Sequence, residues 1–193
     1  MNQKTEQQIK TWARNIRKSD RKAFDEFFRW GYPMLVRFAA GYTGQKSSAS
    51  DIVQDAFVIL WQKRSEINPN RSLKAYLYRI VRNLCLNHLR DSSGTVVDSE
   101  LVQGEAFSSD ELSNESPGNS NGSLDQKFRE WIHALPERQQ EAFELSRFEG
   151  LEHDEIADVM EISPKTVNNH IVAALRQLRT FYEEYQKKLN NDI

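Results

Sequence analysis

Residues 151–179 read LEHDEIADVMEISPKTVNNHIVAALRQLR, and the rest of the chain is best interpreted from this stretch. A short amphipathic segment over residues 151–160 is followed by the turn Glu161-Ile162-Ser163 and by a longer helical segment from Pro164 to about Tyr185. A short helix, a tight turn and a longer helix form the helix-turn-helix pattern. The positions that pack such a pair together hold small or apolar residues, namely Ile156, Ala157, Met160, Ile162 and Val167.

The outer face of the second helix carries residues suited to DNA recognition. The residues expected to point outward near its start are Thr166, Asn168, Asn169, Val172, Ala173 and Arg176. The start of a recognition helix enters the major groove, where Asn pairs with adenine and Arg with guanine. Residues 163–179 hold Lys165, Arg176 and Arg179 and no acid, a local charge of +3. This pattern favours duplex DNA binding over an ordinary helical hairpin with a solvated basic face.

The charge of the chain is unevenly distributed, although the formal net charge is only −2. Residues 1–90 carry a net charge of +10, residues 91–122 carry −7, and residues 123–193 carry −5. Residues 91–122 contain no Lys or Arg, and they lead into the turn-forming run SPGNSNGS at 116–123. We therefore expect a mostly disordered acidic linker between two domains. The basic first domain indicates a polyanionic partner.

Apolar periodicity predicts an all-α fold of two helical domains, with few strand signals. The first helix is expected over about residues 5–18, and Asp20 can cap the second. A break is expected over residues 41–50, with Ser48 or Ser50 capping the third helix. Three further boundaries are expected: a turn at residues 68–70, a helix capped by Ser72, and Pro136 in the first turn of a later helix.

The helix that follows Ser72 carries a polar and aromatic stripe. Spacings of three and four place these residues on one face: Tyr76, Arg79, Asn83, Asn87 and Arg90. Tyr78 and Arg82 are expected to flank it. Such side chains can stack on and hydrogen-bond to splayed-out bases while holding phosphates. A plain solvated face explains the stripe equally well when it is taken alone.

The segment DIVQDAF at residues 51–57 has polar residues beside a clean apolar face. Gln54 and Asp55 lie outside that face, close to Val58 and Ile59. Exposed apolar residues next to polar ones can form a protein-docking surface. A capped helix start with solvated acids explains Asp51 and Asp55 as well.

Enzyme chemistry finds little support in the sequence. The single Cys85 rules out an intramolecular disulfide and a multi-cysteine zinc site, and it has the spacing of a core residue. The four histidines lack metal-type spacing, and no glycine-rich phosphate loop is present. We therefore expect no catalytic residues, no metal and no cofactor. Without a membrane-length apolar run or a signal peptide, we expect a cytoplasmic protein with no direct membrane insertion.

Together these residues resemble a bacterial sigma factor of the sigma-70 family, extracytoplasmic-function (ECF) type. The resemblance covers nearly the whole chain. Its strongest stretches are residues 50–61, residues 73–90 with the sequence LKAYLYRIVRNLCLNHLR, and residues 150–179. It implies a region 2-like domain at 1–90, an acidic flexible linker at 91–122 and a region 4-like helix-turn-helix domain at 123–193. The implied function is to direct core RNA polymerase to promoters and to promote DNA opening.

The resemblance also implies roles for individual residues. The β′ subunit of core polymerase would dock on Asp51, Gln54, Asp55 and Val58. The loop at residues 66–71 and the face of Tyr76, Arg79, Asn83 and Asn87 would open the promoter and hold single-stranded DNA. Duplex DNA would be recognised by Arg147, Lys165, Thr166, Asn168, Asn169, Val172 and Arg176. The partners implied are the polymerase β′ and β subunits, promoter DNA and an anti-sigma factor.

The sequence departs from the family pattern at two positions of the helix-turn-helix. Glu161 stands where the turn often has Gly, and a non-Gly residue at positive φ is unfavourable. Ala173 stands where family members often carry Arg, so one DNA contact is expected to be missing. The alternatives are a stand-alone helix-turn-helix regulator and a helical protein-interaction adaptor. A nucleic-acid-degrading enzyme is the weakest alternative, because no carboxylate cluster for a metal is evident.

Overall fold

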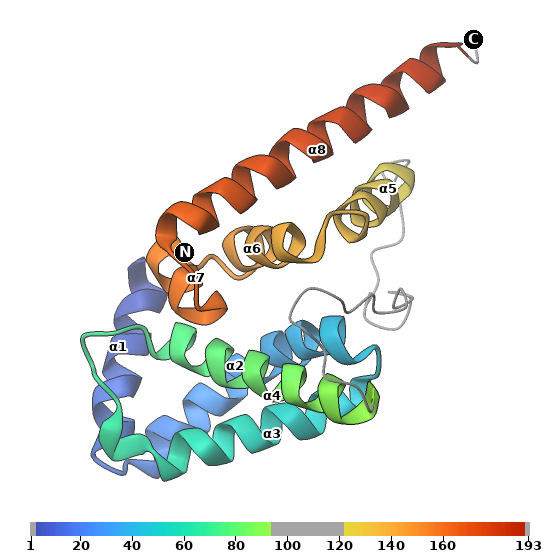
Figure 1. Ribbon diagram of the computed structural model, residues 1–193. Coiled ribbons are helices and arrows are strands. Elements are labelled where there is room, and N and C mark those ends of the chain that lie inside the picture. Colours follow the sequence, from blue (N-terminus) through green and yellow to red (C-terminus); the bar gives the residue numbers. More distant parts are fainter. Residues whose placement is uncertain (1–2, 94–121, 192–193) are drawn as a thin grey trace. The chain divides into compact units, whose positions relative to one another are not determined.

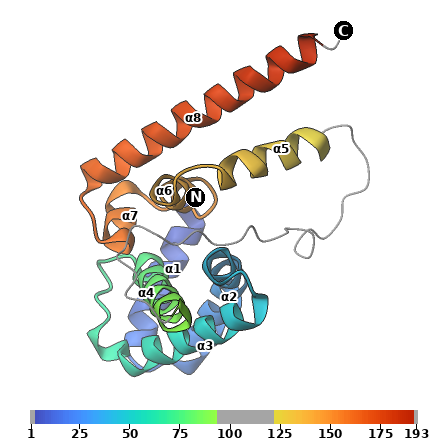
Figure 2. The ribbon, with the colours of Figure 1, turned by 45° about the vertical axis from the view of Figure 1, so that its right-hand side comes forward.

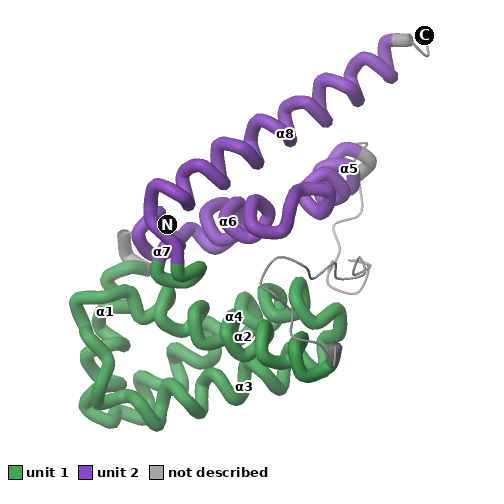
Figure 3. Tube along the Cα trace, in the orientation of Figure 1, with its two compact units in different colours: residues 1–107, 158–161 green, residues 108–157, 162–193 purple. Residues whose placement is uncertain are grey.

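The structure, a computed structural model, describes residues 3–93 and 122–191, and within these ranges every regular element is a helix (Figure 1). The chain divides into two compact units, residues 1–107 with 158–161 and residues 108–157 with 162–193 (Figure 3). The predicted all-α class is confirmed. Most of the predicted linker, residues 94–121, lies outside the described residues. No helix in the described part of the chain has the length and apolarity needed to cross a membrane.

The first unit contains α1 (Gln3–Arg17), α2 (Arg21–Thr43), α3 (Lys46–Gln62), the short 3-10 helix η1 (Arg64–Glu66) and α4 (Leu73–Ser93). Helices α2, α3 and α4 pack against one another, and α1 packs on α2 and α4 (Figures 1 and 2). Their shared core contains side chains that are 0–1% exposed, including Ile16, Phe27, Leu35, Leu60 and Leu77. Burying each of these side chains contributes about 1.5–3 kcal/mol.

Local hydrogen bonds explain where two of these helices begin. The Asp20 carboxylate accepts from the backbone N–H groups of Lys22 (2.9 Å) and Ala23 (3.2 Å), so it caps α2 as predicted. The Ser72 hydroxyl accepts from the Ala75 N–H at 3.1 Å and caps α4. Before it, the Arg71 N–H donates to the Asn68 carbonyl at 3.0 Å, which forms the predicted turn.

The predicted start of the third helix is wrong. Helix α3 begins at Lys46, so Ser48 and Ser50 lie inside it, and the N-cap residue Gln45 makes no side-chain cap hydrogen bond. Gly44 ends α2 in the left-handed conformation (φ +65°), and its N–H donates to the Ala40 carbonyl at 3.0 Å. The chain therefore reverses within two residues. Ala49 is fully buried, so packing rather than a serine cap stabilises this first turn.

The second unit is built from α5 (Gly122–His133), α6 (Glu137–Arg147), α7 (His153–Met160) except its last residues 158–160, which fall in the first unit, and α8 (Pro164–Asn191). Helix α8 runs beside α6 and α5 (Figures 1 and 2). Trp131 and Phe181 are partly buried and pack on the core between these helices. The core itself consists of five buried residues: Ile132, Leu135, Phe143, Ala174 and Leu178. Pro136 is the N-cap residue of α6, one position before the first turn in which it was expected, and α8 continues six residues beyond the predicted end at Tyr185.

Candidate nucleic-acid interface

Helix α4 presents the predicted polar and aromatic stripe on one face. Tyr76 and Arg79 are half-buried, whereas Asn83 and Asn87 are exposed. The Arg79 guanidinium lies over the Tyr76 ring at 5.6 Å from the centroid, a cation–π contact. Arg90 Nη2 donates to Asn87 Oδ1 at 2.5 Å. The stripe therefore combines an aromatic ring, a guanidinium held against it and two amides, which together can stack on bases and hydrogen-bond to them.

Two residues expected to flank this stripe lie elsewhere. Tyr78 is 2% exposed and Arg82 is 5% exposed, so both face the interior of the first unit. The Tyr78 ring packs against Phe38 with centroids 5.0 Å apart, and the Lys74 ammonium lies 5.6 Å from its centroid. The prediction failed because one helical turn separates 78 from 82, and both fall on the same side as the buried Leu77 and Val81.

Helix α3 presents the second predicted surface. Asp51, Gln54, Asp55 and Val58 are all exposed, and Val58 is 53% exposed although it is apolar. The opposite side of the helix is buried in the first unit through Ile52, Val53, Ala56, Phe57 and Leu60. The four exposed residues therefore form one continuous face, with Asp51, Gln54 and Asp55 toward its N-terminal end and the apolar Val58 at its C-terminal end.

A half-exposed aromatic strip beside this surface was not foreseen from the sequence. Phe24 and Phe28 of α2 are only half-buried, as is Trp61 of α3. The Phe24 ring lies 4.9 Å from Trp61, and the Phe28 ring lies 5.0 Å from Tyr32. The spacing 24, 28, 32 along one helix was the available signal, but periodicity alone does not separate a core face from a surface strip.

The helix-turn-helix has the predicted elements and an unusual turn. Ile156 of α7 and Val167 of α8 are fully buried. Glu161 occupies the left-handed region at φ +57°, the conformation that Gly would favour. Ser163 caps α8, because its hydroxyl accepts from the Thr166 N–H at 3.1 Å. The expected residues 161–163 thus form the turn, and a non-Gly residue at its strained position is accommodated.

The start of α8 exposes most of the residues predicted to meet duplex DNA. Five of them are exposed: Lys165, Asn168, Asn169, Val172 and Arg176. Thr166 is half-buried, and its hydroxyl lies 2.8 Å from Ser163 Oγ, so part of its hydrogen-bonding capacity is used in the cap. Arg147 is exposed at the end of α6. The exposed residues combine amides for base edges with cations for phosphates.

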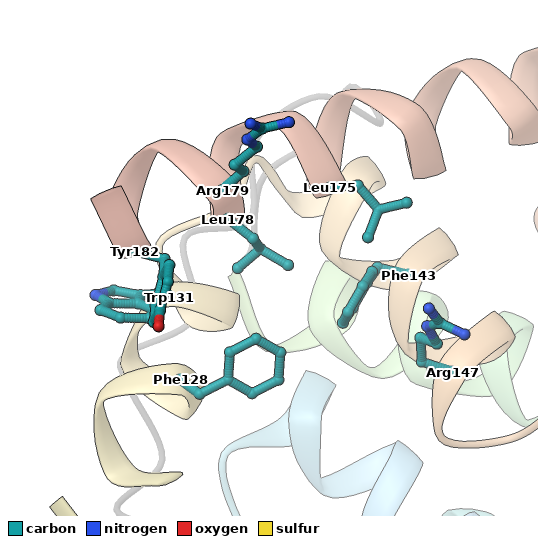
Figure 4. A pocket seen from close by; sticks show the side chains of 8 residues that line it. All are labelled: Phe128, Trp131, Phe143, Arg147, Leu175, Leu178, Arg179 and Tyr182. Atoms are coloured by element: carbon teal, nitrogen blue, oxygen red, sulfur yellow. The ribbon is translucent and has the colours of Figure 1, made fainter. Parts of the chain in front are cut away.

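Arg147 also lines an apolar groove in the second unit that the sequence did not indicate. Figure 4 shows its side chain beside Phe143 and Leu175. The groove has a volume of about 330 Å³, and its lining residues are Phe128, Trp131, Phe143, Arg147, Leu175, Leu178, Arg179 and Tyr182. Three of its apolar side chains remain 39–45% exposed: Phe128, Leu175 and Tyr182. The sequence shows the spacing of these residues on α5 and α8, but it does not show that they are exposed.

Two exposed hydrogen-bonded pairs each shift the pKa of one partner. The pKa of Glu6 is lowered by its hydrogen bond with Lys10, and the pKa of Lys127 is raised by its hydrogen bond with Glu130. Both are exposed helix pairs outside the surfaces described above. Among the described residues, no group of three or more His, Cys, Asp or Glu side chains is placed to hold a metal ion.

Comparison with known families agrees with this geometry. The family model of Sigma-70 region 2 matches residues 27–95, and the model of Sigma-70 region 4 matches residues 125–178. The chain belongs to the sigma-70 family. The two matches lie in the predicted order and together cover more than half of the chain. As a sigma factor, the protein directs RNA polymerase to promoters, and it is not an enzyme.

Relatives of this sigma factor include proteins of the ECF type. It is 26% identical to the RNA polymerase sigma-H factor of Pseudomonas aeruginosa over 179 residues, which covers 88% of this chain and 91% of the relative. It is 26% identical to the ECF RNA polymerase sigma-E factor of Escherichia coli K12 over 165 residues, which covers 82% and 86%. The predicted family and its ECF type are therefore confirmed.

Solved structures share the fold of this sigma factor. CnrH, solved in complex with the cytosolic domain of CnrY, matches with a TM-score of 0.64 at 19% identity over 92% of this chain and 98% of that chain. RpoE of Bartonella quintana, solved with the anti-sigma factor NepR, matches with a TM-score of 0.61 at 22% identity over 84% and 98%. At these identities the likeness concerns the fold alone.

Proposed function

We propose that this sigma factor divides promoter recognition among three surfaces on α3, α4 and α8. The observation that carries the proposal is that each helix buries one side and leaves the predicted residues of the other side accessible. We assign these tasks to a first domain at 1–90 and a second at 123–193, with residues 91–122 as the linker between them. The protein acts in the cytoplasm, where polymerase and promoter DNA are found.

The α3 surface docks on the β′ subunit of core polymerase. Val58 supplies an exposed apolar side chain, and Asp51, Gln54 and Asp55 supply polar groups on its N-terminal side. Protein interfaces combine such groups, because apolar anchors contribute most of the affinity and the polar groups beside them exclude water. The carboxylates add electrostatic selectivity for a basic partner surface. The β subunit contacts the chain elsewhere.

The α4 surface holds the separated promoter strand. Tyr76 offers a ring for base stacking, Arg79 a cation for phosphate, and Asn83 and Asn87 offer amides for base edges. Stacking on an aromatic side chain contributes about 1–3 kcal/mol per base. That gain is comparable to the few kcal/mol needed to unstack and flip a base out of a duplex. The surface can therefore favour the open state without a catalytic group.

The start of α8 reads duplex DNA. Asn168, Asn169 and Val172 are placed for base edges in the major groove. Three cations position the helix on the phosphate backbone of the DNA: Arg147, Lys165 and Arg176. Thr166 contributes less than predicted, because its hydroxyl is engaged with Ser163.

An anti-sigma factor regulates this protein by covering one or more of these surfaces. The proposal rests on the fold shared with RpoE of Bartonella quintana, which was solved with the anti-sigma factor NepR. Co-purification of the chain from its own cells, followed by identification of bound proteins and a run-off assay with and without them, tests it. A bound protein that leaves transcription unchanged argues against this part.

Run-off transcription with purified core polymerase and a promoter library tests the main proposal. Promoter-dependent transcripts are expected with the intact chain. Asn83→Ala should impair strand opening, seen with permanganate footprinting, and leave duplex binding unchanged. Asn168→Ala should weaken duplex binding, while opening on a pre-melted template stays normal. Equal loss of duplex affinity in both variants contradicts the division of tasks.

A further inference from the structure

We propose that Ser19, at the corner between α1 and α2, is a phosphorylation site for a serine/threonine kinase that selects basic substrates, and that Arg64 of η1 receives the phosphate. Phosphorylation there would oppose capture of a promoter strand, because Arg64 lies beside the loop at residues 66–71. This consequence rests on the proposed function, which assigns that loop to strand opening.

The corner between α1 and α2 presents Ser19 in a fixed and accessible turn. Ser19 is exposed and occupies the left-handed region at φ +66°. Its N–H donates to the Ile16 carbonyl at 2.8 Å, and the Asp20 N–H donates to the Asn15 carbonyl at 3.1 Å. These bonds hold the backbone of a short connection between two helices. Exposed connections of this kind are where modifying enzymes reach a chain most easily.

Cations flank Ser19 on both sides along the chain. Residues 14–22 contain one acid, Asp20, and carry a net charge of +4. The five cations of this stretch are all exposed: Arg14, Arg17, Lys18, Arg21 and Lys22. A kinase whose substrate groove is acidic would bind this segment through charge complementarity, whereas one with a basic groove would be repelled. The flanking charges therefore select the class of enzyme.

Arg64 already contacts the oxygen that would carry the phosphate. Its Nε donates to Ser19 Oγ at 2.9 Å, although the two residues are far apart in sequence. Its Nη1 donates to the Trp61 carbonyl at 2.8 Å, and its guanidinium lies over the Trp61 ring at 4.6 Å from the centroid. These contacts orient the guanidinium before any phosphate is present. Guanidinium and phosphate form charge-assisted hydrogen bonds, which are about twice as strong as neutral ones.

The modification is an ordinary phosphoryl transfer with ATP as the donor. A bond forms between Ser19 Oγ and the γ-phosphorus of ATP, and the bond from that phosphorus to the bridging oxygen breaks, so ADP leaves. The hydroxyl proton passes to the base of the kinase. The product carries a charge of about −1.5 to −2 at neutral pH, which offsets up to half of the +4 on residues 14–22.

The position of Arg64 connects this corner to the loop that we assign to strand opening. The Ile67 N–H donates to the Arg64 carbonyl at 3.3 Å, and the Glu66 N–H donates to the Lys63 carbonyl at 2.9 Å. Ile67 is 5% exposed, so it anchors the start of the loop in the first unit. A phosphate bound to Arg64 would neutralise a cation at the start of the loop and repel the phosphates of a captured strand.

The first arm of the test asks whether Ser19 is modified in the cell. The full-length chain is isolated from its own cells in exponential and in stationary growth, and its phosphopeptides are mapped by mass spectrometry. We expect phosphate on Ser19, lost in Ser19→Ala. Ser65→Ala is the matched control, because Ser65 is also exposed and follows Lys63 and Arg64, and it should retain the Ser19 phosphate. Ser19 free of phosphate in both growth phases would overturn the proposal.

The second arm tests Arg64 as the receptor of the phosphate. Phosphoserine is incorporated at position 19 during translation, and its second ionisation is followed by phosphorus NMR. The second pKa of a free phosphoserine is about 6, and a neighbouring cation lowers it by favouring the dianion. Arg64→Gln should raise this pKa toward the free value, and Arg64→Lys, which keeps the charge, should raise it less.

Lys10→Gln is the control for this titration. Lys10 lies earlier on α1, where it is exposed and bonded to Glu6 at 2.7 Å, so its loss should leave the phosphate pKa unchanged. A phosphate pKa that is the same with and without Arg64, or one that Lys10→Gln raises as much as Arg64→Gln, would overturn the assignment of Arg64.

The third arm measures the consequence for strand capture. The chain phosphorylated at Ser19 should bind a fluorescent single-stranded promoter oligonucleotide about three- to fivefold more weakly than the unmodified chain at low salt. The difference should shrink at high salt, because salt screens exposed charges. Run-off transcription by the phosphorylated holoenzyme should fall in parallel. Unchanged binding and transcription would overturn this consequence.

The outcomes separate this proposal from the proposed function. If Asn83→Ala impairs strand opening and phosphorylation of Ser19 does not, the effect on strand capture fails while the proposed function stands. If the unmodified chain gives no promoter-dependent transcript, the proposed function fails. Phosphopeptide mapping and the phosphate titration then still decide whether Ser19 and Arg64 form a modification site.

Discussion

Replacing Glu161 by Gly should stabilise the helix-turn-helix. Glu161 holds φ at +57°, which costs a residue with a Cβ about 1–2 kcal/mol relative to a right-handed conformation. Glycine avoids this cost but loses about 0.5–1 kcal/mol more conformational entropy on folding. The Glu161 side chain is exposed, so its removal forfeits little packing. The expected net gain is about 0.5–1 kcal/mol.

Hydrogen–deuterium exchange of α7 and α8 measures this gain in the intact protein. A whole-chain melting curve would mix the transitions of two units, whereas exchange reports local opening. A gain of about 0.5–1 kcal/mol corresponds to exchange about two- to fivefold slower. Amides of α2 and α3 in the first unit provide the internal reference.

Glu161→Ala is the matched control for this prediction. It removes the carboxylate but keeps the Cβ, so it should leave the exchange rates of α7 and α8 nearly unchanged. If Ala slows exchange as much as Gly, the effect comes from the lost charge and not from the backbone. Faster exchange in Glu161→Gly would refute the assigned strain.

Three further changes test other parts of the structure. Ser163→Ala removes the cap of α8 and should cost about 1 kcal/mol, seen as faster exchange in its first turn; unchanged exchange there would contradict the stabilising role of the cap. Leu60→Ala should cost about 2–5 kcal/mol in the unfolding of the first unit, measured by hydrogen exchange at its core amides, because Leu60 is fully buried; a loss below about 1 kcal/mol would show that the core collapses around the gap. Val58→Asp should leave the unfolding of the first unit unchanged. It should weaken assembly with core polymerase at least 10-fold, measured by sedimentation, as expected for an interface anchor. Unchanged assembly would show that Val58 is not part of the docking surface.

The sequence predicts the helices where a cap or an apolar period is strong. Asp20 and Ser72 cap as expected because each has a free backbone N–H two or three residues ahead. The expected caps Ser48 and Ser50 fail because a left-handed Gly44 and a buried Ala49 already fix the start of α3. That choice depends on tertiary packing, which local spacing does not encode.

For the candidate surfaces, the sequence predicts the exposed polar residues but not the exposed apolar ones. Polar residues opposite an apolar face, such as Asn83 and Gln54, are exposed as expected. Apolar residues at a surface are missed, because Phe128 and Leu175 follow the same periodicity as core residues. Only the arrangement of α5, α6 and α8 shows that the other described residues leave them exposed.

The cation–π contact on α4 affects the entropic cost of binding a melted strand. Arg79 already rests on Tyr76, and Asn87 is already bonded to Arg90, so these side chains have given up much of their rotamer freedom before any strand arrives. Asn83 is exposed and has no side-chain hydrogen bond within the described residues. Immobilising a rotamer-rich side chain on binding costs about 0.5–1.5 kcal/mol. The surface is thus preorganised except at one amide, and the entropic cost of recognising a flipped base falls mainly on Asn83.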